Sequence, residues 1–139
     1  MHVEFIATVA VIAADPEASR RLYVDALGLP LQSQSGGDYV WTDKLDGAKH
    51  FAVWPLSQAA EACFGTSEWP ADRPVPQVSI EFEVQDADAV AAAADELREK
   101  GFALLHEARE EPWGQTVARL LSNEGSIVGI SYAPPQHAD

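Results

Sequence analysis

Val9-Ala-Val-Ile-Ala-Ala-Asp15 is an apolar, strand-like segment that ends in an aspartate. The same pattern returns in Val78-Ser-Ile-Glu-Phe-Glu-Val-Gln-Asp86, about half the chain later. Each aspartate can accept hydrogen bonds from the free amides at the start of a helix, and an amphipathic helical pattern follows both of them. Gly28 and Gly101 then suit the left-handed position that ends each helix. The sequence therefore predicts two copies of one structural unit.

Three further strand-like segments follow each predicted helix. They are Leu29–Gln34, Tyr39–Thr42 and Lys49–Pro55 in the first copy, and Ala103–Glu107, Thr116–Ser122 and Ser126–Tyr132 in the second. The predicted fold is α+β: two tandem βαβββ modules that form a curved mixed-sheet half-barrel with a concave cleft. We expect one structural domain, with modules at residues 1–65 and 78–134, a stiff Pro-rich linker at 66–77 and a frayed tail at 135–139.

Composition narrows the classes of partner. The 139 residues carry a net charge of −13, which disfavours nucleic acid and favours a cation, although such charge also serves solubility alone. Cys63 is the single cysteine, so the chain can form no internal disulfide. The apolar run from Phe5 to Ala14 is too short to span a bilayer and has no Lys or Arg before it. We expect a cytoplasmic protein that does not enter membranes.

A family resemblance rests on two segments. The order of strand, aspartate, helix and Leu-Gly-Leu in Val9–Leu29 resembles the first module of vicinal oxygen chelate proteins. Glu111-Pro-Trp-Gly-Gln-Thr-Val-Ala-Arg-Leu-Leu-Ser-Asn-Glu-Gly125 is similar to the closing hairpin of their second module. This superfamily includes glyoxalases, bleomycin-resistance proteins and dioxygenases. The resemblance implies the fold more strongly than any one activity, because one scaffold hosts many functions.

The resemblance also implies where a divalent metal would bind. Enzymes of this superfamily hold it with four side chains on the concave face, one on the first strand and one on the last strand of each module. Carried onto this sequence, the positions are Thr8, Ser79, one near Gly129, and one near Ala52 with His50 on the same face.

These residues match the metal-binding pattern poorly. Thr8, Ser79 and Gly129 are weak ligands for a divalent ion, and one imidazole at His50 does not make a site. A shift of one or two residues in register would bring in a carboxylate instead. The sequence therefore predicts no metal cofactor and leaves a divalent metal as a disfavoured alternative.

Strand alternation predicts what lines the cleft. In Val78–Val84 the apolar residues should face the helix, so that Ser79, Glu81 and Glu83 face the concave side. Thr8 holds the equivalent position in the first module. The alternative is that Glu81 and Glu83 lie at an open rim and are simply solvated.

Tryptophans are the second set of candidate ligand-binding residues. Trp113 stands in the Pro-Trp-Gly segment that lies by the ligand cleft in similar proteins, and Trp54 shares a strand face with His50. Aromatic rings stack on planar rings and on cations. The alternative for each tryptophan is packing in the core.

Three functions remain open from the sequence. The favoured one is a protein that binds and sequesters a small aromatic, cationic molecule without a metal, as bleomycin-resistance proteins do. The others are a metal-dependent lyase, isomerase or dioxygenase, and a metal-free enzyme with Glu81 or Glu83 as general base. The sequence thus favours a binding protein over an enzyme and names no catalytic residue. We also expect a homodimer, because a half-barrel leaves sheet edges that a second copy can cover.

Overall fold

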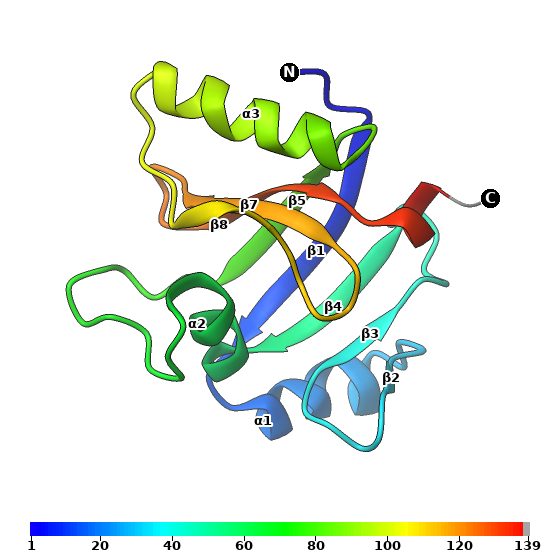
Figure 1. Cartoon of the computed structure of the whole chain (residues 1–139). Coiled ribbons are helices and arrows are strands. Elements are labelled where there is room, and N and C mark those ends of the chain that lie inside the picture. The colour runs from blue at the N-terminus through cyan, green and yellow to red at the C-terminus, as the bar shows by residue number, and fades with distance from the viewer. Residues whose placement is uncertain (138–139) are drawn as a thin grey trace.

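The computed structural model describes residues 1–137 as a single mixed sheet with helices on both faces (Figure 1). The eight strands follow the order β2-β3-β4-β1-β5-β8-β7-β6. The elements are β1 (Phe5–Ala13), α1 (Pro16–Arg20), η1 (Arg21–Ala26), β2 (Gln32–Ser33), β3 (Val40–Thr42), β4 (His50–Pro55), α2 (Leu56–Phe64), β5 (Val78–Glu83), α3 (Ala87–Glu99), β6 (His106–Glu110), β7 (Thr116–Leu121), β8 (Ile127–Tyr132) and η2 (Pro134–His137).

The predicted repeat is confirmed in the sheet topology. β1 pairs in parallel with β4, and β5 pairs in parallel with β8, so each module closes on its own first strand. Antiparallel pairing of β1 with β5 joins the two modules into one sheet. Both predicted helix caps are present, because Asp15 accepts from the amide of Ala18 and Asp86 accepts from the amide of Ala89. The α+β half-barrel predicted from the sequence is therefore the fold of the chain.

The two faces of the sheet have different partners. α3 lies against β7 and β8 at the top of Figure 1, and the segment of α1 and η1 lies below β4. Phe82 and Val84 pack against Val90 of α3, as alternation along β5 predicts. The opposite, concave face carries Ala10, Ala52 and other residues of the first and last strands of each module.

The helix α2 differs from the sequence-based expectation. The segment after β4 forms a helix from Leu56 to Phe64 that covers part of the concave face. Ala59 and Cys63 are buried there against Ala52 of the sheet. A turn of helix thus occupies space that we expected to be an open cleft. Gly65 ends α2 with a φ of 79°, in the left-handed region that favours glycine.

Three smaller differences concern element ends. β6 begins at His106, three residues later than predicted, and its pairing with β7 contains a register shift. The first helix continues after Arg20 as a wider π-type turn. The chain also folds back through His137 where we expected a frayed tail from residue 135, while residues 138–139 lie outside the described residues. Among residues 1–137, no helix is long and apolar enough to cross a membrane.

Candidate functional site

Four neighbouring strands place polar residues in the middle of the concave face. Thr8 of β1 lies opposite His50 on one side and Glu81 on the other, and Glu81 lies opposite Gly129 of β8. A Cβ atom at Gly129 would come within 3.1 Å of Glu81 Cγ, so the glycine makes room for the glutamate side chain. Glu81 is only 9% exposed and is not solvated at a rim. The prediction that it faces the concavity is confirmed.

A buried hydrogen-bond network starts at Glu81. The side-chain amide of Gln115 donates to Glu81 Oε1 at 2.9 Å and to Ser131 Oγ at 2.8 Å. Gln115 Oε1 in turn accepts from the indole nitrogen of Trp113 at 2.9 Å. Gln115 therefore connects the interior carboxylate to the tryptophan on the surface. It also restricts the orientation of the Trp113 ring.

Glu83 takes a different position from Glu81. Its carboxylate is fully buried and accepts from the backbone amide of Ala133, and it lies 2.9 Å from His137 Nε2. Burial raises the pKa of Glu83 above its usual range, although these contacts and Ser131 act against the shift. Glu83 thus holds the C-terminal turn and is not presented to a ligand.

His50 is also fully engaged. Its Nε2 lies 2.8 Å from the hydroxyl of Tyr39, and its Nδ1 lies 2.6 Å from Asp43 Oδ1. Burial, with the charges of Glu81 and Asp43 nearby, raises the pKa of Tyr39 above its usual value, so its hydroxyl stays protonated. Trp41 stacks on the imidazole at 5.3 Å. Both ring nitrogens of His50 are therefore used within the protein.

A groove of about 490 Å³ opens between α2 and the loop from β6 to β7. Two of the predicted ligand-binding residues, Trp54 and Trp113, line it. Trp54 is mostly buried in the core that α2 covers, so it serves both the core and the groove wall. Trp113 is 62% exposed, which sets it apart from a core tryptophan. The groove lining does not include the other predicted ligand-binding residues, namely Thr8, His50, Ser79, Glu81 and Glu83.

Charged residues of the groove divide into paired and unpaired groups. Arg109 donates to Glu111 at 2.7 Å and also bonds the carbonyl of Ala62 in α2. Glu111 lies in addition 3.6 Å from the buried guanidinium of Arg119. Glu61 and Glu110 also line the groove, and neither forms an ion pair with any residue in the range 1–137. The uncommitted charge of the groove is therefore negative.

Arg119 lies behind the groove and is 1% exposed. Its guanidinium is 5.7 Å from the centre of the Trp54 ring and 3.2 Å from His106 Nε2. Burial, together with the nearby arginines, lowers the pKa of His106, so a neutral imidazole accepts the arginine N–H. Arg119 on β7 thus contacts the Trp54 ring on β4 and helps to hold it in place.

Cys63 behaves as an inert thiol. It lies on the buried face of α2 and is 2% exposed. Arg119 and Arg109 are close enough to favour its thiolate, a feature that the sequence did not reveal, but burial outweighs them and raises the pKa of Cys63 to about 11. The thiol is therefore protonated near neutral pH.

The metal positions implied by the family resemblance do not fit a divalent ion. Thr8 lies opposite His50, which singles out His50 and not Ala52 as the first-module position, but both imidazole nitrogens already have partners. In the second module Gly129 lies opposite Glu81 and not Ser79, so the register shift that brings in a carboxylate is present. Glu81 Oε1, however, already accepts from Gln115, and Gly129 has no side-chain donor. Within the described chain, no three His, Cys, Asp or Glu side chains converge as a metal site.

Comparison with known proteins agrees with this architecture. The sequence profile of the Glyoxalase/Bleomycin resistance protein/Dioxygenase superfamily matches residues 5–128. The chain belongs to this superfamily. A search of curated proteins finds no significant match.

Several solved structures share the fold at low sequence identity. A methylmalonyl-CoA epimerase variant from Streptomyces coelicolor is 15% identical, with a TM-score of 0.62 over 99% of this chain and 100% of that one. The Mycobacterium tuberculosis methylmalonyl-CoA epimerase is 20% identical, with a TM-score of 0.60 over 99% and 93%. A superfamily member from Vibrio splendidus 12B01 is 16% identical, with a TM-score of 0.56 over 91% and 98%. At these identities the likeness establishes the fold alone.

Several residues of the site were missed by the sequence analysis. Gln115 was quoted within the hairpin but given no role, and Glu61 lies on α2, which was not predicted. The helix could have been predicted from apolar residues at helical spacing, namely Leu56, Ala59, Ala60 and Cys63. Arg109 and Glu110 belong to β6, whose predicted range ended at Glu107.

Proposed function

We propose that this superfamily member binds and sequesters a small, planar, positively charged molecule in the groove between α2 and the β6–β7 loop, without a metal. The observation that carries the proposal is Trp113, a large aromatic side chain that is 62% exposed and is held by a hydrogen bond to Gln115. A ring whose orientation is already restricted loses little further entropy when a ligand stacks on it. The groove volume of about 490 Å³ lies within the range of small-molecule sites.

Charge supports a cationic ligand. Glu61 and Glu110 line the groove as carboxylates without ion-pair partners in the described chain, while Arg109 is committed to Glu111 and Ala62. The whole chain carries a net charge of −13, which raises the local concentration of cations. The charged partners proposed from the sequence, Glu81 and Glu83, are buried and bonded inside the protein, so Glu61 and Glu110 take that role in the proposal.

The test uses one ring system with and without a permanent charge. Quenching of tryptophan fluorescence is titrated with 10-methylacridinium and, at a pH where it is neutral, with acridine. The cation should bind more tightly than acridine, and added salt should weaken the binding of the cation but not that of acridine. Trp113→Ala should weaken binding roughly five- to thirty-fold, as expected for loss of ~1–2 kcal/mol of stacking and cation–π energy.

Two further variants separate charge from stacking. Glu61→Gln with Glu110→Gln should bring the affinity for the cation close to that for acridine, because the groove then lacks uncommitted carboxylates. Phe102→Ala removes an aromatic ring that is 53% exposed between α3 and β6, outside the groove, and should change neither affinity. Equal binding of both ligands in the unaltered protein would contradict the proposed cation preference.

A further inference from the structure

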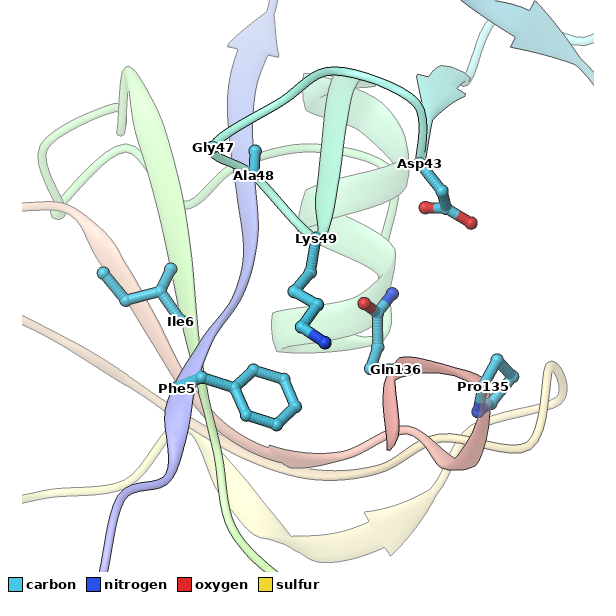
Figure 2. Close-up of a pocket in the computed structure, with 8 residues that line it drawn as sticks. All are labelled: Phe5, Ile6, Asp43, Gly47, Ala48, Lys49, Pro135 and Gln136. Carbon is cyan, nitrogen blue, oxygen red and sulfur yellow. The ribbon is translucent and has the colours of Figure 1, made fainter. Parts of the chain in front are cut away.

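A second cavity lies between the start of β1, the loop before β4 and the C-terminal turn, and the proposed function does not use it. Its volume is about 610 Å³. The groove near Trp113 includes Trp54 at the end of β4. This cavity lies at the start of β1 and beside the start of β4 (Figure 2). The residues that line it include Phe5, Ile6, Asp43, Lys49, Pro135 and Gln136. The two cavities therefore present different chemistry to solvent.

The C-terminal turn forms one wall of this cavity and is anchored to the sheet. His137 lies 2.9 Å from the buried carboxylate of Glu83. Its ring also contacts the rings of Phe5 at 5.3 Å and Tyr132 at 5.1 Å. The buried polar group Glu83, which no ligand in the Trp113 groove could reach, thus has a role in building the second cavity. Pro135 and Gln136 are presented to it as a consequence.

Lys49 supplies the positive charge of the cavity. Its Nζ lies 4.8 Å from the centre of the Phe5 ring, and Lys49 forms no ion pair with any residue that the structure describes. Figure 2 shows the lysine side chain extending across the cavity toward the C-terminal turn. Asp43 is the other charged residue of the lining, and its Oδ1 is already bonded to His50. Lys49 is therefore the basic residue of the lining, and its ammonium is free to donate to an anionic ligand.

We propose that this cavity is a second binding site, for a small molecule that carries a carboxylate on an apolar ring. The carboxylate would accept hydrogen bonds from the ammonium of Lys49, and the ring would contact Phe5, Ile6 and Pro135. An ammonium over an aromatic ring, beside apolar side chains, matches the two halves of such a ligand. The charge preference is opposite to that of the Trp113 groove, so the two sites can be tested independently.

The experiment follows backbone amide shifts by NMR during titration with benzoate and with its neutral isostere benzamide. Benzoate should shift the amides of Gly47, Lys49 and Gln136. Benzamide should bind about tenfold or more weakly, because its neutral carbonyl accepts from the Lys49 ammonium without forming an ion pair. Lys49→Gln should reduce the benzoate affinity to that of benzamide. Asp43→Asn should tighten benzoate binding, because it removes a like charge from the cavity.

Trp113→Ala serves as the matched control, since it alters only the other groove and should leave benzoate binding unchanged. It also separates this inference from the proposed function, which concerns cation binding and predicts the reverse dependence on these variants. Equal shifts with benzamide, unchanged binding in Lys49→Gln, or weaker binding in Asp43→Asn would each overturn the assignment. An absence of shifts at these amides with tens of millimolar benzoate would overturn it as well.

Discussion

Glu83 is the residue whose position has the clearest energetic consequence. A fully buried carboxylate is costly when ionised, and two hydrogen-bond partners on the C-terminal turn compensate only in part. Burial accordingly raises the pKa of Glu83 above that of the unfolded chain. The native state therefore binds the proton of the Glu83 carboxyl group more tightly than the unfolded state does.

The raised pKa of Glu83 predicts a pH dependence of stability. The contribution of Glu83 should be fully present below the ordinary glutamate pKa and should be lost as pH rises through the raised native pKa. Glu83→Gln should lack this dependence, because a glutamine side chain has no proton to lose. Urea unfolding of the wild type and of Glu83→Gln should be compared from pH 4 to pH 7. We expect the wild type to lose stability relative to the variant across this range, and a constant difference would contradict the assignment.

The sequence predicted which way Glu81 and Glu83 point, but not what each of them does. Strand alternation is enough to place both on the concave face, and the structure confirms it. Their roles depend on Gln115, which reaches Glu81 from the start of β7, and on His137, which reaches Glu83 from the far end of the chain. Such contacts between distant segments leave no periodic signal in a single sequence.

At the scale of elements, α2 determines where a ligand can bind. It packs Ala59 and Cys63 into the concave face and leaves a groove beside its exposed side. In the sequence this segment looks like the end of the first module, because the second module contains no copy of it. An element that breaks the repeat is easily missed when the repeat guides the interpretation. The shifted start of β6 has a similar cause, since a register irregularity with β7 does not appear in strand propensity.

Cys63 reports on the packing of α2. With the pKa of its thiol raised to about 11, only roughly one thiol in a thousand is ionised at pH 8, and the sulfur is buried as well. We predict that iodoacetamide modifies the native protein far more slowly than the unfolded chain at the same pH. Mass spectrometry of samples taken at increasing urea concentration would measure this. Rapid modification in the absence of urea would mean that α2 does not stay on the sheet.

At the scale of the whole molecule, the module repeat could be predicted because short sequence patterns at the ends of the helices indicate it. The capping residues Asp15 and Asp86 and the glycines that end both helices recur at matching places in each half. The pairing of β1 with β5 follows from the same symmetry. The cavities could not be predicted in this way, because both are built by segments outside the repeat, namely α2 and the C-terminal turn.

The sheet ends at two edge strands, and we predict that the protein forms a homodimer. β2 and β6 each have one unpaired side in the described chain, and unpaired edges favour association. Sedimentation velocity at micromolar concentration should give about twice the chain mass of 15.0 kDa. A single species with the mass of one chain would contradict this prediction.

Native mass spectrometry tests the central claim, a groove that binds a planar cation without a metal, most directly. The purified protein is measured with and without EDTA, and then with 10-methylacridinium under both conditions. Without 10-methylacridinium we predict the mass of the metal-free homodimer, unchanged by EDTA. With 10-methylacridinium we predict one bound cation per chain, and EDTA should not change its occupancy. A divalent metal that EDTA removes, together with loss of the bound cation, would contradict the account.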